Sequence, residues 1–150
     1  HNRITDRGLE ALAHSLHMTE LRRLSLSGHQ SISSAGLRAL ANSRHLRALE
    51  DLNLGGCDVG DEGVEALASS RSIARLRRLS LFNNPLTPRA LEVIAREPLF
   101  ADLEYLRLPD HTYASEQGVR ALLESEHLGG WIKRHVRDMV CRVGDLLELD

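Results

Sequence analysis

Residues 49–68 read LEDLNLGGCDVGDEGVEALA, and stretches with the same pattern recur along the chain at intervals of 27 or 28 residues. The position that Gly63 holds in this stretch is held in the other copies by Gly8, Gly36, Ala90 and Gly118. A period of this length is typical of a solenoid, in which each unit buries its apolar residues only against neighbouring units. We therefore expect a stack of similar units.

Each of four full units opens with three leucines, and the last two are two residues apart, as on one face of a strand. The sets are Leu21-Leu24-Leu26, Leu49-Leu52-Leu54, Leu76-Leu79-Leu81 and Leu103-Leu106-Leu108. Some 20 residues separate successive strands, so the strands must be parallel, with right-handed connections. The pattern predicts strands near 22–26, 50–54, 77–81 and 104–108, with a helix after each and one before the first.

The expected helices carry both a start signal and a buried face. A serine or threonine, able to accept hydrogen bonds from the first free amides, precedes four of them, and Gly60 takes this place in the third unit: Thr5, Ser33, Thr87 and Ser115. Apolar residues then follow at helical spacing, as in Leu37, Leu40 and Ala41. Each unit thus contributes to one continuous core.

This pattern resembles the leucine-rich repeat family, in its ribonuclease-inhibitor-like class with one strand and one helix per unit. The resemblance covers about residues 2 to 128 and implies an α/β horseshoe, with parallel strands on the concave face and helices on the convex face. It also implies that ligands bind on the concave face or its rim. We divide the chain into repeats at 1–128, a half unit plus four full units, and a C-terminal segment at 129–150.

The C-terminal segment breaks the pattern. Trp131 takes the first leucine position of a sixth unit, but Arg134 falls where the second leucine should be, and an unpaired charge is costly in a core. Apolar residues instead keep helical spacing at Ile132, Val136, Met139, Val140, Val143 and Leu147. We predict a capping helix from Trp131 to about Leu149. The alternative is an amphipathic helix that docks a partner or a following domain.

A polar residue follows each strand: His29, Cys57, Asn84 and His111, with Asn2 in the half unit. The resemblance implies that Asn or Cys here bonds to loop backbone, and buried amides do need partners. We predict that Cys57 is a structural thiol and that His29 and His111 also bond to loop backbone.

The alternatives are a reactive thiol at Cys57 and a metal site. Two ligands, His29 and Cys57, are too few for structural zinc, and His111 should lie about 15 Å from His29. We expect no metal and no cofactor.

Composition and motifs argue against several classes of function. The formal net charge of −2 gives no bulk attraction to nucleic acid or to anionic membranes, and no apolar run approaches a membrane span. No phosphate-binding loop, zinc-protease motif or nucleophile elbow occurs, so we predict no enzymatic activity and no catalytic residue. Two cysteines favour a reducing, cytoplasmic setting. Of the 19 basic residues only Lys133 is a lysine, which is typical of a GC-rich, bacterial genome.

The residues between the strand leucines should form the concave face. Charges alternate along two rows, Arg22-Glu50-Arg77-Glu104 and Arg23-Asp51-Arg78, as in ladders of ion pairs. Phe82, Tyr105 and Arg107 have no such explanation, and aromatic residues and arginine dominate interface energetics. We therefore predict a partner-binding surface formed by Arg23, Asn53, Arg78, Phe82, Tyr105 and Arg107. The alternative is that these are ordinary surface side chains that bind no partner.

The predicted function is a non-enzymatic scaffold that binds a protein or peptide on the concave face. The alternative is a recognition or regulatory module of a larger enzyme or effector whose catalytic part lies outside this chain. The chain begins with His1, inside a half unit that has no strand. We therefore expect further repeats or domains upstream. We also expect this fragment either to unfold first at residues 1–20 or to pair edge to edge with another copy.

Overall fold

The computed structural model describes residues 4–147, apart from the side chains of Ala114 and residues 143–147. Helices and strands alternate along this part of the chain up to its last two helices, which follow one another, and short 3-10 helices (η1–η3) lie in three of the connections. The elements are α1 Asp6–His14, η1 Leu16–Met18, β1 Arg23–Ser25, α2 Ser34–Ala41, β2 Asp51–Asn53, α3 Asp61–Ala68, β3 Arg78–Ser80, α4 Pro88–Arg96, η2 Pro98–Phe100, β4 Tyr105–Arg107, η3 Asp110–Ala114, α5 Glu116–Glu124 and α6 Gly130–Leu147.

The four strands form one parallel sheet in the order β1-β2-β3-β4, which confirms the predicted architecture. Each strand has three residues and not the five that the leucine pattern suggested. The hydrogen bonds at the strand entrance explain why each strand begins one residue later than predicted. The N–H groups of Glu50 and Asp51 both donate to the carbonyl of Arg22, at 2.9 and 3.0 Å, so the regular ladder begins only after this shared acceptor.

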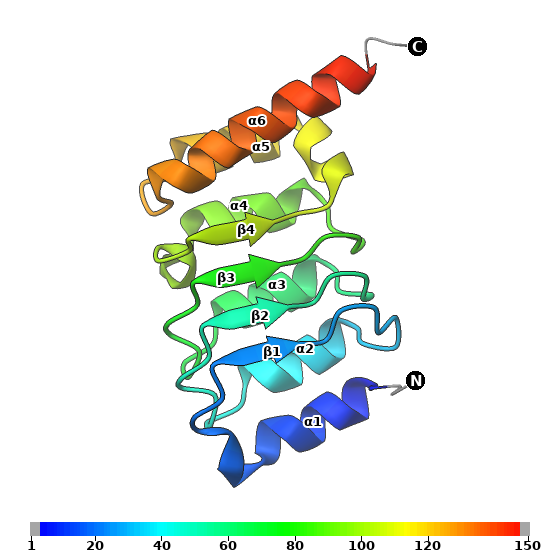
Figure 1. Cartoon of the computed structure of the whole chain (residues 1–150), viewed down its shortest axis with the longest axis vertical. Coiled ribbons are helices and arrows are strands. Elements are labelled where there is room, and N and C mark those ends of the chain that lie inside the picture. Colours follow the sequence, from blue (N-terminus) through cyan, green and yellow to red (C-terminus); the bar gives the residue numbers. More distant parts are fainter. Residues whose placement is uncertain (1–3, 148–150) are drawn as a thin grey trace.

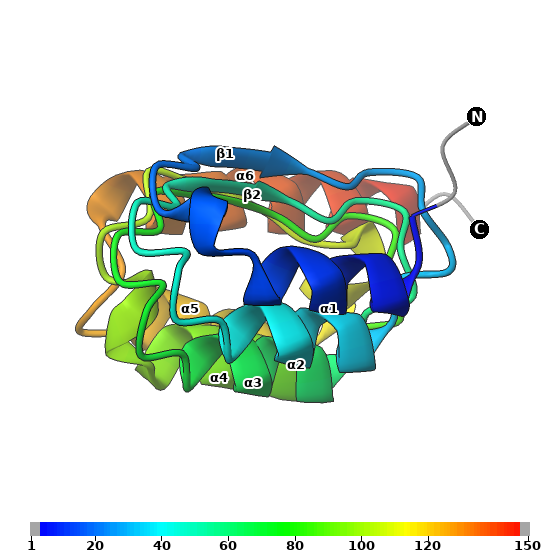
Figure 2. The same ribbon diagram turned by 90° about the horizontal axis from the view of Figure 1, so that it is seen from below.

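The sheet and the first five helices form two layers. Figure 1 shows the strands stacked in sequence order, and Figure 2 shows α1 to α5 in a second layer on one side of the sheet. Helix α6 departs from this arrangement, because it lies at the level of the strands, beyond β4. The other surface of the sheet, which we call the sheet face, is the one that the resemblance expects to be concave.

Three of the predicted N-caps form. The side-chain oxygens of Ser33, Thr87 and Ser115 accept from backbone N–H groups in the first turns of α2, α4 and α5. Thr5 makes no such hydrogen bond, so the expectation for the first helix is wrong.

Side chains at both ends of the helices tie consecutive units together. The carboxylate of Asp6 accepts from the backbone N–H and the hydroxyl of Ser33, at 2.8 and 2.6 Å. Asp61 accepts from the same two groups of Thr87, which also lies in the next unit. At the other end of the helices, the hydroxyls of three serines donate to the last carbonyls of the preceding unit's helix: Ser43 to Ala13, Ser70 to Ala41 and Ser125 to Ala95. These hydrogen bonds connect the helices of neighbouring units in addition to the contacts of the apolar core.

The apolar core runs between the two layers. Strand leucines fill it, and all of these are at most 2% exposed: Leu26, Leu52, Leu54, Leu79, Leu81, Leu106 and Leu108. Burial is less complete at the first unit, where Leu12, Leu21 and Leu24 are only partly buried.

Helix α6 extends this core past the last strand. Ile132 and Val136 are buried, and Met139 and Val140 pack partly against the core, as their helical spacing predicted. The side chains of Val143 and Leu147 lie outside the described residues. Among the described helices, none combines the length and the apolar character that crossing a membrane requires.

Candidate functional site

The outward residues of the four strands line up across the sheet face. In the register of the sheet, Arg23, Asp51, Arg78 and Tyr105 are neighbours in one row, and the next row contains Ser25, Asn53, Ser80 and Arg107. The first of these rows contains the charged row that the repeat spacing predicted, Arg23-Asp51-Arg78. The intervening leucines point into the core, so the sheet face displays only the variable positions of each unit.

Most charges on this face are paired. Nε of Arg78 lies 3.4 Å from Oδ2 of Asp51, and at the strand entrance Arg22 lies 3.5 Å from Glu50. Arg77 pairs with Glu104 in the same entrance row. Arg23 and Arg107 form no ion pair with any residue between 4 and 147 that the structure describes. Ion pairs therefore form in both expected rows, but only between alternate neighbours, and among the described residues Arg23 and Arg107 have no carboxylate partner.

Two arginines on this face lie over aromatic rings. Cζ of Arg107 is 4.4 Å from the centre of the Phe82 ring, and Cζ of Arg78 is 4.6 Å from the centre of the Tyr105 ring. Both distances are within the range of cation–π attraction. The Phe82 ring itself lies against Gly55, where a Cβ atom would be 1.9 Å from a ring carbon. Glycine at position 55 therefore makes room for Phe82 on the sheet face.

Trp131 adds a third aromatic ring to this group. Its centre is 6.5 Å from the centre of the Tyr105 ring, and His135, one turn further along α6, stacks on it at 5.6 Å. Trp131 is 53% exposed, although the residue after it, Ile132, is completely buried. We call the group formed by Arg78, Phe82, Tyr105, Arg107, Trp131 and His135 the aromatic–arginine surface.

Four of the six predicted partner-binding residues belong to this surface, and Arg23 and Asn53 do not. Arg23 lies on β1, at the opposite edge of the sheet from Tyr105 and Arg107. The side-chain oxygen of Asn53 accepts a hydrogen bond from the backbone N–H of Gly55 at 3.0 Å, so this oxygen shapes the loop after β2. Sequence reasoning missed Trp131 and His135 as surface residues. The signal was present, because Trp131 and His135 are one helical turn apart and both fall outside the apolar set Ile132, Val136 and Met139.

The residues after the strands bond to loop backbone. For His29, Nδ1 lies 3.0 Å from the carbonyl of Leu26, and for His111, Nε2 lies 2.9 Å from the carbonyl of Leu86 in the preceding unit. These contacts confirm the backbone bonding predicted for both rings. Between residues 4 and 147, the described side chains include no group of three His, Cys, Asp or Glu that could hold a metal ion.

Asn84 and Cys57 hold two neighbouring loops together. Nδ2 of Asn84 donates to the carbonyls of Leu54 and Leu81, at 2.8 and 2.9 Å, and its Oδ1 accepts from Val59 N–H at 3.0 Å. The thiol of Cys57 donates to the carbonyl of Leu26 at 3.3 Å. Burial raises the pKa of Cys57, which keeps it in the thiol form and supports the structural role.

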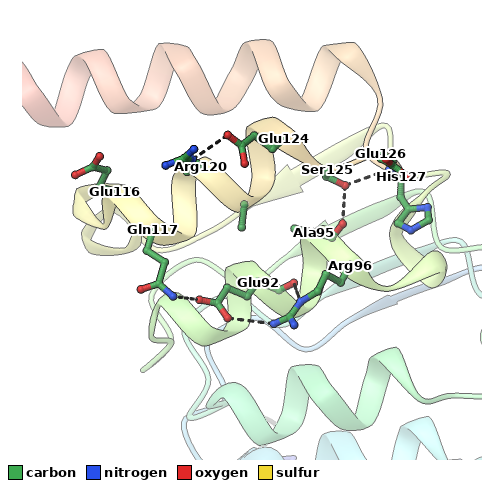
Figure 3. Close-up of a pocket in the computed structure, with 11 residues that line it drawn as sticks. Glu92, Ala95, Arg96, Glu116, Gln117, Arg120, Glu124, Ser125, Glu126 and His127 are labelled. Carbon is green, nitrogen blue, oxygen red and sulfur yellow. Dashed lines mark hydrogen bonds and ion pairs between the residues drawn. The ribbon is translucent and has the colours of Figure 1, made fainter.

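An open groove of about 820 Å³ lies on the helix side, between α4 and α5 (Figure 3). Most of its charged side chains form hydrogen bonds or ion pairs with one another. Glu92 bonds to Arg96 at 3.1 Å and to Gln117 at 2.5 Å, and Arg120 pairs with Glu124 at 2.8 Å. The groove thus offers few uncompensated groups, and the aromatic–arginine surface is the better candidate site.

Comparison with known proteins supports the repeat pattern and the fold. The Leucine Rich repeat family model matches residues 1–13, 17–41 and 42–68. No curated protein matches the sequence.

Two solved structures superpose on nearly the whole chain. The tropomodulin C-terminal domain of Caenorhabditis elegans has 19% sequence identity and a TM-score of 0.62, with 97% of each chain covered. The leiomodin-1 domain described as Actin-Binding Site 2 has 17% identity and a TM-score of 0.57, with 99% of this chain and 94% of that chain covered. At such low sequence identity, the structural similarity is evidence for a shared fold and for nothing further. Together with the recurring leucines and the parallel sheet, these matches show that the chain contains leucine-rich repeats and folds as a leucine-rich repeat solenoid.

Proposed function

We propose that this chain is a non-enzymatic interaction module that binds a protein or peptide partner on the sheet face, at the aromatic–arginine surface. The observation that carries the proposal is the exposure of Trp131, at 53%, beside Tyr105. Arg78 lies over the Tyr105 ring, and Arg107, two residues from Tyr105 on β4, lies over the Phe82 ring. Tryptophan, tyrosine and arginine are the residues most enriched at binding hot spots. Arg23 and Asn53 remain predicted contacts for a partner long enough to reach β1 and β2.

The fold supports the same function. The leiomodin-1 domain, described as an actin-binding site, uses this fold for protein recognition, although 17% identity transfers no partner to the present chain. We also infer membership of the ribonuclease-inhibitor-like class, because each unit combines one strand with one helix within 27 or 28 residues.

The test is capture of partners from the native cell by the intact tagged protein, in wild-type form and as two single variants. The described residues include two large hydrophobic side chains classed as exposed, Trp131 and Leu16, the latter 70% exposed and in η1 at the other end of the molecule. Trp131→Ala should weaken partner recovery by about 10- to 100-fold, equivalent to about 1–3 kcal/mol. The matched control Leu16→Ala should leave it unchanged.

Thermal melting of both variants establishes that they remain folded. The proposal is wrong if the two substitutions reduce recovery equally, or if Trp131→Ala has no effect on any captured protein.

A further inference from the structure

The sheet face is electropositive although the chain as a whole is acidic. Its two central rows contain Arg23, Arg78, Arg107 and a single acid, Asp51, so three positive charges and one negative charge give a net +2. The whole chain has a formal net charge of −2. The entrance row of two arginines and two glutamates is neutral and adds nothing to this difference. A partner on this face therefore meets a local field that favours negative charge.

Arg107 is the cation on this face that is best placed to bind a negatively charged group of a partner. Arg78 already shares its guanidinium with Asp51, whereas no described carboxylate lies within 4.0 Å of Arg107. The Phe82 ring covers one face of the Arg107 guanidinium, and donors at the edge of the group stay available. A planar guanidinium held in this way loses little freedom when it binds a carboxylate with two parallel hydrogen bonds.

An apolar contact lies next to this cation at a defined distance. Tyr105 and Arg107 project from the same face of β4 and are two residues apart, which corresponds to about 7 Å along a strand. Trp131, packed beside Tyr105, widens the apolar contact. Residues two apart in an extended peptide have the same spacing as Tyr105 and Arg107, so one peptide can reach both contacts at once.

We propose that the aromatic–arginine surface binds an extended acidic segment of a partner protein, with a carboxylate on Arg107 and an apolar side chain two residues away on Tyr105 and Trp131. This inference rests on the proposed function and specifies the chemistry of the partner. The acidic segment is favoured over a nucleic acid strand, because phosphate backbones need a row of uncompensated cations. Here Arg22, Arg77 and Arg78 are paired, and Arg23 lies three strands from Arg107, at about 14 Å.

The test uses short synthetic peptides of serine and threonine that carry a glutamate and a leucine two positions apart. A matched peptide has glutamine in place of glutamate. Binding is followed by the fluorescence of Trp131, the only tryptophan of the chain. We expect the glutamate peptide to bind about tenfold more tightly than the glutamine peptide, which is typical of a charged hydrogen bond. Arg107→Gln should abolish this preference.

Arg23→Gln is the control, since it removes the same charge from the same face but away from the proposed contact. It should preserve the preference for glutamate. Equal binding of the two peptides, absence of binding by both, or equal effects of the two arginine variants would each overturn the inference. Tighter binding of an oligothymidine than of the glutamate peptide would do so as well and would indicate a nucleic acid surface.

The two proposals fail separately. If partner capture from cells depends on Trp131 but the peptides are not distinguished, the acidic contact is wrong and the binding surface stands. If the peptides are distinguished but capture does not depend on Trp131, the acid-binding chemistry is present and the proposed function is wrong.

Discussion

The two ends of the solenoid bury equivalent residues to different extents. Leu24 in β1 and Leu106 in β4 occupy the same position in their units, yet Leu24 is only partly buried and Leu106 is 1% exposed. Beyond β4, helix α6 and η3 continue the structure, with Ile132 and Tyr113 in the core (Figure 1). On the other side of β1, the described residues supply α1 in the helix layer but no element in the sheet layer.

This difference shows that a leucine in a repeat is not buried by its own unit. The units around Leu24 and Leu52 contain the same leucine pattern, yet only the side chain of Leu52 is completely buried. The neighbour on each side supplies the missing contacts, as expected when stability is a sum of units and interfaces. Among the described residues, no strand pairs with the outer edge of β1, and such an edge is the usual template for pairing with another strand.

The largest expected effect concerns these equivalent leucines. Leu52→Ala and Leu106→Ala should each lower the free energy of unfolding by about 2–5 kcal/mol, because each leaves a cavity among buried residues. Leu24→Ala should cost about 1–2 kcal/mol, since part of its side chain already contacts water. Urea denaturation of the three variants and the wild type measures the differences.

Hydrogen exchange checks the same comparison without substitution. In a monomeric sample, amide protons of α1 should exchange faster than those of α3, because the first unit opens locally at lower cost. Equal protection of the two helices, or a Leu24→Ala cost equal to that of Leu52→Ala, would show that the N-terminal end is as closed as the middle.

A second prediction concerns alkaline pH and the C-terminal end. Tyr113 in η3 is 3% exposed, and burial raises its pKa from 10.0 to about 12. Because the folded protein holds this proton more tightly than the unfolded chain, the contribution of Tyr113 to stability is complete below about pH 10. It is lost as the pH rises through about 12, with a total of about 3 kcal/mol.

Tyr113→Phe removes the ionisable group and keeps the ring. Between about pH 8 and about pH 11 the wild type should lose at least about 1 kcal/mol more stability than the variant. Denaturation at the two pH values measures this, and parallel losses in both proteins would contradict the assigned burial of the phenol in the C-terminal core.

The sequence predicted the features of the fold that repeat in every unit. Leucines at a fixed period imply parallel strands in sequence order, and the register follows because equivalent residues pair, as Leu24, Leu52, Leu79 and Leu106 do. The links made by Asp6 and Asp61 were not predicted, because they occur only in some units. They also join residues 27 and 26 positions apart that no local pattern connects.

The candidate site was only partly predictable for a related reason. Phe82, Tyr105 and Arg107 stood out as exceptions to the charge ladders, and the structure places them with Arg78. Trp131 occupies the first leucine position of a sixth unit and begins the predicted capping helix, and neither pattern predicts its outward position. Asn53 shares a row with Arg107, but whether its oxygen faces a partner or the loop depends on one local hydrogen bond, which spacing cannot reveal.

The smallest expected effect concerns the helix caps of the first two units. The Ser33 hydroxyl accepts from Ala35 N–H at 3.1 Å and donates to Asp6 at 2.6 Å, whereas Thr5 has no side-chain cap bond. Ser33→Ala should therefore cost about 1–2 kcal/mol and Thr5→Ala only a few tenths.

Combining Ser33→Ala with Asp6→Ala separates the cap from the link between the units. Because the two side chains share a hydrogen bond, the double variant should lose less stability than the sum of the single variants. Denaturation of the four proteins measures this coupling. Strict additivity would mean that Asp6 does not hold α1 to the second unit. A cost for Thr5→Ala as large as that for Ser33→Ala would mean that the first helix is capped as firmly as the second. Either result would remove one of the differences between the first described unit of the solenoid and its interior.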